Sequence, residues 1–260
     1  MKIYYLPLIA LLISTTGCSF FSKDEVKTAD NWSVERIYSE AKSALDAEDY
    51  ISALSHYSQL EARFPFGQYA QQALLESAYA YYKTDEPETA LATIDRFMRV
   101  YPLNENMDYA LYLRALVNFT RDIGLLEKYI PRDESQRDPG AALLALNDFK
   151  TLVNRFPTSK YSEDATQRIV YLRNRLAQHE VNVAHYYMRR GSYVAAANRG
   201  KYVIENYPRT PAMPEALLMM AKAYKVLELN ELSEDALRIL ELNYPGYDGV
   251  AKVHQTTLEK

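Results

Sequence analysis

Apolar and small residues recur at three- and four-residue steps along most of this 260-residue chain, with short polar breaks between the runs. The clearest case is the stretch 71–102, where such positions lie on both sides of a break at 85–87: Leu74, Ala78 and Tyr81, then Ala90, Ile94 and Phe97. This spacing predicts two amphipathic helices joined by a tight turn. One helical hairpin cannot bury its own apolar face, so the pattern requires neighbouring copies.

The copies are marked by proline. A small residue stands twelve positions before a proline that follows an aromatic residue: Ala53/Pro65, Ala90/Pro102, Ala145/Pro157 and Ala196/Pro208, with Ser233 in the same position before Pro245. A second small residue stands 24 positions before the proline: Ala41/Pro65, Ala78/Pro102, Ala184/Pro208 and Ala221/Pro245. These offsets resemble the tetratricopeptide repeat, in which small residues lie where paired helices touch and a proline ends the second helix.

The repeat resemblance predicts an all-α fold, a superhelical solenoid of five tetratricopeptide-like helix hairpins. The repeats are expected at 34–67, 71–104, 108–159, 177–210 and 214–247. A helical bundle with accidental periodicity is the alternative, but a bundle has no reason to repeat one proline register.

The third repeat is longer than the others, because Ala115 precedes Pro157 by 42 positions instead of 24. The extra residues lie at 121–139, and we expect there a loop or short helix that is either a binding element or a tolerated insertion. Between Pro157 and Gly191 the helical pattern contains no breaker. This predicts one long helix shared by the third and fourth repeats.

Composition argues against nucleic-acid binding and against catalysis. The net charge is -4 with acids and bases interspersed, whereas nucleic-acid binding needs a concentrated basic face. The four histidines have no cysteine or HExxH partner, and the eight glycines form no phosphate-binding loop. We therefore expect no enzymatic activity, no catalytic residues, no bound metal and no cofactor.

The first 17 residues are predicted to be a signal peptide, with Lys2 as a positive start and 3–13 as an apolar core too short to span permanently. Cys18, the only cysteine, follows directly. A signal peptide that ends at such a cysteine resembles the bacterial lipobox, which implies a diacylglycerol and an acyl chain on Cys18. Ser19 in the next position implies sorting to the outer membrane, with 18–33 as a tether. An unlipidated secreted protein is the alternative.

A binding surface is expected along the first helix of each repeat, which lines the concave face in the tetratricopeptide repeat family. In the amino-terminal half, 34–120, the corresponding positions are Tyr38, Lys42, Leu75, Tyr79, Tyr82, Lys83, Tyr109, Tyr112, Leu116 and Phe119. Such a trough suits an extended peptide with an aromatic last residue, whose ring would contact the aromatics and whose carboxylate would contact lysine. The alternative is that these rings pack between repeats.

The carboxy-terminal half, 140–247, is more basic and less aromatic. Its candidate docking residues are Arg189, Arg190, Arg199, Lys222 and Lys225. A basic surface on a rigid helical array suits an acidic protein partner. The tail 248–260 is polar.

Longer strings resemble one family, that of BamD, the lipoprotein of the outer-membrane barrel assembly machine. They are RFPFGQYAQQALLESAYAYYK at 63–83, TIDRFMRVYP at 93–102, RDP at 137–139 and NRFPTSKY at 154–161. The resemblance implies a non-catalytic scaffold on the periplasmic face of the outer membrane. It would dock through its carboxy-terminal repeats on the periplasmic domains of the insertase BamA and bind other Bam lipoproteins.

The family resemblance also implies recognition of the carboxy-terminal signal of unfolded outer-membrane proteins, which ends in an aromatic residue. This agrees with the aromatic trough predicted from the repeat positions. Two other functions stay open: a pilot lipoprotein that escorts a secretin, and a peptidoglycan-associated structural lipoprotein.

Overall fold

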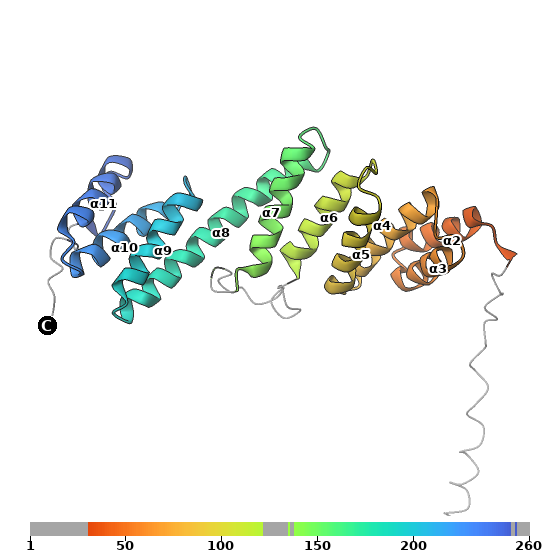
Figure 1. Ribbon diagram of the computed structural model, residues 1–260, viewed down its shortest axis with the longest axis horizontal. Helices are drawn as coiled ribbons and strands as arrows, with labels where there is room; N and C mark the ends of the chain where they lie inside the picture. The colour runs from red at the N-terminus through yellow and green to blue at the C-terminus, as the bar shows by residue number, and fades with distance from the viewer. Residues whose placement is uncertain (1–30, 122–134, 136–137, 251–252, 254–260) are drawn as a thin grey trace, which may run out of the picture. The chain divides into compact units, whose positions relative to one another are not determined.

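The computed structural model describes residues 31–121, 135, 138–250 and 253, and these form α-helices joined by short turns, without a strand (Figure 1). The helices are α2 (Val34–Asp46), α3 (Tyr50–Arg63), α4 (Gln68–Lys83), α5 (Pro87–Val100), α6 (Met107–Thr120), α7 (Gly140–Arg155), α8 (Ser162–Arg189), α9 (Tyr193–Asn206), α10 (Met213–Val226) and α11 (Asn230–Asn243). The predicted fold class, an all-α array of tetratricopeptide-like hairpins, is confirmed. The predicted signal peptide, Cys18 and most of the insertion 121–139 lie outside the described residues.

The contacts divide the chain into two units, one ending at Ala70 and one beginning at Gln71. In the first unit α2 packs on α3. Ala41 and Ala53, the two small residues of the first repeat, are fully buried there. Ser33 caps α2 by accepting from the Arg36 N–H, and Asp49 caps α3 by accepting from the Ser52 N–H at 3.1 Å.

The second unit begins with α4, α5 and α6, which share one apolar core. Ala78 of α4 and Ala90 of α5 are fully buried in it, beside Ile94 and Phe97. Small side chains at these positions let the helix axes approach closely, so that the larger residues interdigitate around them.

The next core joins α6, α7 and α8 around Phe149. The long helix predicted from the missing breaker is confirmed, because α8 runs unbroken for 28 residues. Figure 1 shows it passing from beside α7 to beside α9, and it packs on both. One helix therefore belongs to two successive hairpins.

The last helices, α9, α10 and α11, also contact one another at small residues. Gly200 of α9 lies so close to α10 that a Cβ there would stand 2.8 Å from the Ala216 carbonyl oxygen. Ser233, which occupies the position that alanine holds in the other repeats, is buried on α11 and donates to the Ala221 carbonyl oxygen at 2.9 Å. The buried serine hydroxyl therefore has a hydrogen-bond partner, and the side chain keeps the small size that this position requires.

Five helices end in the same way. An aromatic residue directly before a proline donates its N–H to the carbonyl oxygen four residues earlier, at 2.7 to 2.8 Å: Phe64, Tyr101, Phe156, Tyr207 and Tyr244. Helical backbone angles are disfavoured for the residue before a proline, so the proline favours ending the helix there. The aromatic–proline pairs thus fix where the second helix of each hairpin ends.

Charged groups also join successive helices. Arg114 of α6 pairs with Asp95 of α5 at 3.0 Å and with Asp148 of α7 at 2.6 Å. The Asp148 side chain is only 6% exposed, and Asn118 donates to its second oxygen at 3.2 Å. Burial raises the pKa of Asp148, and its bonds to Arg114 and Asn118 act in the opposite direction.

The close helix contacts predict that a larger side chain destabilises the protein at a buried alanine but not at an exposed alanine of the same helix. We expect Ala90→Leu to lower the free energy of unfolding by about 1–3 kcal/mol, because α5 cannot admit a larger side chain at this contact. Ala92→Leu on the same helix is the matched control, because Ala92 is exposed, and it should change stability by less than about 0.5 kcal/mol. Urea unfolding followed by circular dichroism measures both, and equal midpoints for the two variants would contradict the assignment of Ala90 to a close contact.

The shared arginine provides a second prediction. Asp148→Asn should destabilise by about 3 kcal/mol, since it leaves a half-buried guanidinium without its nearest carboxylate. Asp95→Asn removes a half-exposed partner of the same arginine and should cost less than about 1 kcal/mol. Thermal unfolding of the two variants compares them directly, and a larger loss for Asp95→Asn would show that the buried pair does not hold α6 against α7.

Candidate functional site

A hollow of about 610 Å³ lies in the second unit, where α4, α6 and two interhelical loops meet. Its lining residues come from α4 (Gln72, Leu75, Glu76), from the loop before α6 and its first turn (Glu105, Asn106, Asp108, Tyr109), and from the loop between α7 and α8 (Phe156, Thr158, Ser159, Lys160, Tyr161). The hollow therefore combines an apolar part with a polar margin. This is the usual composition of a binding site.

Side-chain hydrogen bonds hold the two loops in place. Asn104 donates to Gln71 of α4 at 2.7 Å, which ties the first loop to α4. Ser159 donates to the Asp108 carboxylate at 2.6 Å, which ties the second loop to the first turn of α6. Asp108 also accepts from the Tyr109 N–H at 2.7 Å, at a helix end where a negative charge is favourable.

Three tyrosine rings lie together, and two of them, Tyr109 and Tyr161, line the hollow. Tyr161 stacks on Tyr112 with ring centroids 4.7 Å apart and contacts Tyr109 at 5.5 Å. The Lys160 ammonium lies 5.1 Å from the centroid of the Tyr161 ring. A bound aromatic side chain would find rings already ordered in tilted and stacked arrangements.

Tyr109 is the residue best placed to recognise a ligand. Burial, reinforced by Tyr161, Tyr79 and the charge of Glu76, raises its pKa well above the usual value. The phenol therefore stays protonated at physiological pH. Among the described residues its hydroxyl has no hydrogen-bond partner, so it can donate to a ligand carbonyl.

The predicted groove residues fall into three groups. Leu75 and Tyr109 line the hollow. Tyr79 and Tyr82 are partly buried against the α4–α6 core, and Lys83 is exposed at the end of α4, outside the lining. The third group comprises residues that contact neighbouring helices or lie in the first unit: Tyr112, Leu116, Phe119, Tyr38 and Lys42.

Within the third group, the side chains already have partners. Tyr112 donates to Asp164 of α8 at 2.7 Å, and burial together with this bond raises its pKa to about 12. Phe119 packs against Phe149 and lies 5.0 Å from the Arg168 guanidinium. In the first unit, Lys42 forms an ion pair with Asp46 at 2.7 Å.

The repeat positions missed the residues that the α7–α8 loop contributes. Phe156, Lys160 and Tyr161 follow the second helix of a repeat, whereas the rule considers first helices only. The string NRFPTSKY, which contains all three, was a signal of the family and not of the site.

A second hollow of about 540 Å³ lies along α8. Its lining includes Arg189, His179, His185 and Ser135, the last a buried residue of the insertion. Ser135 is held on α8 because Asn182 donates to its hydroxyl at 2.7 Å and the His179 Nδ1 lies 2.8 Å from its carbonyl oxygen. The insertion is thus attached to α8 at this residue.

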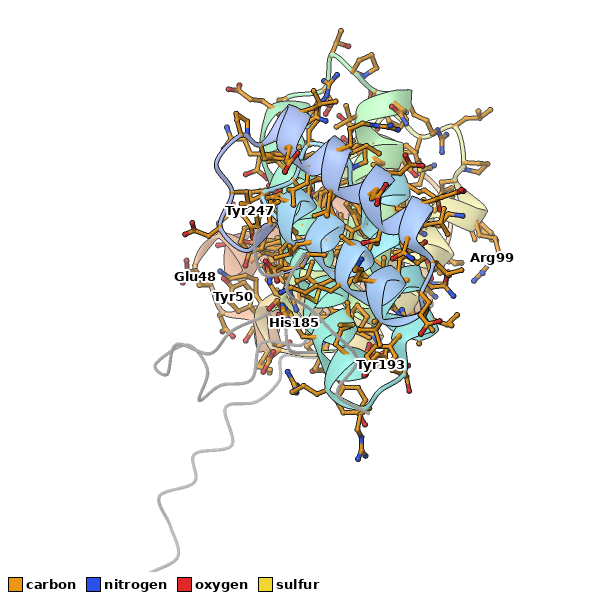
Figure 2. All side chains as sticks on the ribbon, turned by 90° about the vertical axis from the view of Figure 1, so that its left-hand side faces the viewer. Glu48, Tyr50, Arg99, His185, Tyr193 and Tyr247 are labelled. Carbon is orange, nitrogen blue, oxygen red and sulfur yellow. The ribbon has the colours of Figure 1, made fainter. Side chains whose placement is uncertain are left out.

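The end of α8 is joined to later elements through Glu215 of α10. The His185 Nε2 lies 3.1 Å from one carboxylate oxygen, and the Tyr247 hydroxyl donates to the other at 2.7 Å. His185 and Tyr247 are labelled in Figure 2. No group of three or more metal-ligating side chains occurs among the residues that the structure describes.

The five predicted docking residues all belong to α8, α9 and α10 or the turns after them. Arg199 donates to Glu180 at 3.0 Å, and this bond raises the pKa of Arg199. Arg190 lies over the Tyr186 ring and donates to its hydroxyl at 3.3 Å. The remaining three are Arg189, which is exposed, and Lys222 and Lys225, which are half-buried; Lys225 donates to Asn230 at 3.1 Å.

Comparison with known proteins places the chain in a family. The family model YfiO, described as outer membrane lipoprotein, matches residues 30–239. The curated outer membrane protein assembly factor BamD of Neisseria gonorrhoeae is 44% identical over 244 residues, which cover 94% of this chain and 91% of that protein. BamD of Xylella fastidiosa strain Temecula1 is 39% identical, with 92% and 81% covered.

Among solved structures, a tetratricopeptide repeat protein from Parabacteroides merdae superposes with a TM-score of 0.37 and 16% identity, over 85% of this chain and 72% of that one. This weak likeness adds nothing to the helix contacts described above. The family match and the curated relatives are sufficient by themselves: the chain belongs to the BamD family.

Proposed function

We propose that this protein is an assembly factor for outer membrane proteins and acts as a non-catalytic scaffold. The proposal is supported by the family to which it belongs and by the name that its relatives carry. In the hollow, Ser159 donates to Asp108 and no histidine is present among the lining residues described. A serine held in this way stabilises a loop, and the described lining offers no imidazole of the kind that activates a serine nucleophile.

We place the protein on the periplasmic face of the outer membrane, anchored by acyl chains on Cys18. No described helix is long and apolar enough to cross a membrane. Two acyl chains suffice for stable anchoring. The polar segment 18–33 would connect the anchor to the first repeat.

The client is an unfolded outer membrane protein, held by its aromatic carboxy-terminal signal. The observation that carries this proposal is the hollow of about 610 Å³ with Tyr109, Phe156 and Tyr161 among its lining residues. An extended peptide could place its last ring among these rings and accept a hydrogen bond from Tyr109. Lys160 is the only basic residue in the described lining and would contact the terminal carboxylate.

The insertase BamA is the proposed partner of the carboxy-terminal repeats, with other Bam lipoproteins as further partners. Arg189 and Arg190 lie at the end of α8, and Arg199 lies in the middle of α9. Arg199 is 43% exposed despite its pair with Glu180, so it can contact a second carboxylate. Such charge pairs across an interface set orientation and specificity.

The client site is tested with a fluorescent peptide that ends in phenylalanine. Tyr109→Ala should weaken binding about tenfold, a loss of ~1.4 kcal/mol, because it removes both a ring contact and a hydroxyl donor. Tyr109→Phe keeps the packing and should give a smaller loss. Tyr202→Ala, a tyrosine on α9 outside the hollow, is the matched control and should bind as the unaltered protein does. Equal affinity for all four proteins, measured by fluorescence anisotropy, would rule out the hollow as the client site.

The insertase site needs a charge swap, because Arg199 already has a partner. Arg199→Glu would place a carboxylate opposite Glu180, whose side chain is only 12% exposed, and would weaken the contact between α8 and α9. The double variant Glu180→Arg/Arg199→Glu restores that pair while reversing the charge on the surface. We expect both variants to reduce copurification with BamA about tenfold, with the double variant as stable as the unaltered protein in thermal unfolding. Full recovery of BamA by the double variant would show that Arg199 acts only within the fold.

A further inference from the structure

An apolar stripe lies exposed on α11, the last helix of the second unit (Figure 1). We call it the α11 stripe, and its four residues are 45 to 76% exposed: Leu229, Leu232, Ile239 and Leu242. Leu232 and Ile239 are two helical turns apart, and each has a leucine three positions away, so the four lie along one side of the helix. Large apolar residues that gather on one exposed face indicate an interaction surface, whereas single ones do not.

A different side of α11 forms the core of the last hairpin. α11 packs on α10, and its buried residues are Ser233, Ala236, Leu237 and Leu240. After the helix, the chain packs against the same core through Tyr247, Val250 and Val253. The described residues that follow α11 therefore cover the α10–α11 contact and leave the α11 stripe exposed.

The α11 stripe is also distinct from the side on which a further hairpin would stack. Two pairs correspond when α5 and α11 are aligned on the small residue and the proline of each repeat: Met98 with Glu241, and Leu91 with Glu234. Met98 packs against the core of the following helices, whereas Glu234 and Glu241 are exposed. Polar residues at these positions end the array, as they do in the terminal repeat of a solenoid.

The same alignment shows that the repeat pattern does not require the α11 stripe. The four positions carry Glu86, Thr89, Arg96 and Arg99 in α5. In α3, α7 and α9 they include at most one large apolar residue each, which is Leu144 in α7 and Tyr202 in α9. Four large apolar residues at these positions are therefore specific to α11.

Acidic residues border the stripe. The exposed charged residues within 228–243 are five acids and one base: Glu228, Glu231, Glu234, Asp235, Glu241 and Arg238. The single base, Arg238, donates to Asp235 at 2.7 Å. A second copy on this face in a two-fold dimer would bring acids against acids, and an anionic membrane surface would also be repelled.

We propose that the α11 stripe docks a helix of another protein, one whose apolar face is bordered by lysine or arginine. The apolar side chains of such a helix would pack on Leu232 and Ile239, as an amphipathic helix does on an apolar surface. Its cations would lie beside the acids that border the stripe. This surface differs from the hollow proposed for the client and from the arginines proposed for the insertase, so the inference depends on neither.

The test uses the whole chain and three synthetic helical peptides that carry a fluorophore. The first peptide has leucines at positions i, i+3, i+7 and i+10, bordered by lysines. The second has glutamates in place of the lysines, and the third has glutamines in place of the leucines. By fluorescence anisotropy at low salt, we expect the first peptide to bind on the order of tenfold more tightly than either of the others.

Variants assign this binding to α11. Leu232→Ser/Ile239→Ser should weaken the first peptide on the order of tenfold, because it removes the centre of the apolar contact. Val100→Ser/Leu103→Ser is the matched control, since it changes two exposed apolar residues elsewhere in the second unit, and it should bind as the unaltered protein does. Glu228→Lys/Glu231→Lys should reverse the preference between the lysine and glutamate peptides. Circular dichroism melting curves verify that each variant is folded.

The remaining outcomes overturn the inference. If the first peptide does not bind, or binds Leu232→Ser/Ile239→Ser equally well, the stripe does not dock such a helix. A dimer in sedimentation velocity that this variant loses would assign the stripe to a second copy of the chain. Binding of a Cys18→Ser form, which has no acyl anchor, to phosphatidylglycerol vesicles would assign the stripe to a membrane surface if the serine pair abolished it.

Discussion

The close approach of paired helices at small side chains is the constraint on which this structure depends. Ala53, Ala90, Ala145 and Ala196 are fully buried at equivalent places in successive hairpins. Each of these alanines lies a fixed number of residues before the end of its helix, because the aromatic–proline pair that follows sets that end. The small-residue contacts and the helix ends together give successive hairpins the same geometry. Larger residues such as Phe97 and Phe149 fill the space between the helices.

The hollow is a consequence of that geometry in the second unit. Loops before α6 and before α8 emerge at the same end of neighbouring hairpins, and short polar bonds hold them against α4 and α6. Aromatic residues that end or follow helices are thereby brought beside aromatic residues within helices. Tyr109 and Tyr161 are 52 positions apart in the chain, yet their rings are in contact. The hollow is formed without any element that departs from the repeat.

The sequence was sufficient to predict the helices, because helix formation here depends on local periodicity and on breakers. The length of α8 followed from the lack of any glycine or proline between Pro157 and Gly191. The site was predictable only in part. Leu75 and Tyr109 lie at repeat positions that face the hollow, but the contribution of Tyr161 depends on how a loop folds back.

Polar contacts between residues far apart in the chain could not be predicted from the sequence either. Arg114 pairs with Asp95 and Asp148, 19 and 34 positions away, and no periodic pattern distinguishes these aspartates from exposed ones. The same holds for Ser135, whose anchoring on α8 depends on two side chains more than 40 positions later. Periodicity identifies which face of a helix is buried, whereas the pairing of polar groups follows from the assembled structure.

The continuity of α8 has a mechanical consequence. A helix of 28 residues is ~42 Å long, and a sharp bend at any point would break the backbone hydrogen bonds there. Asp164 and Arg168 near its first turns contact the Tyr112 side of α6, while His179 and Arg189 line a hollow near its other end. A force applied at Arg189 would therefore tilt α8 as a whole and displace the residues around Tyr112. A hinge between repeats would absorb such a force instead.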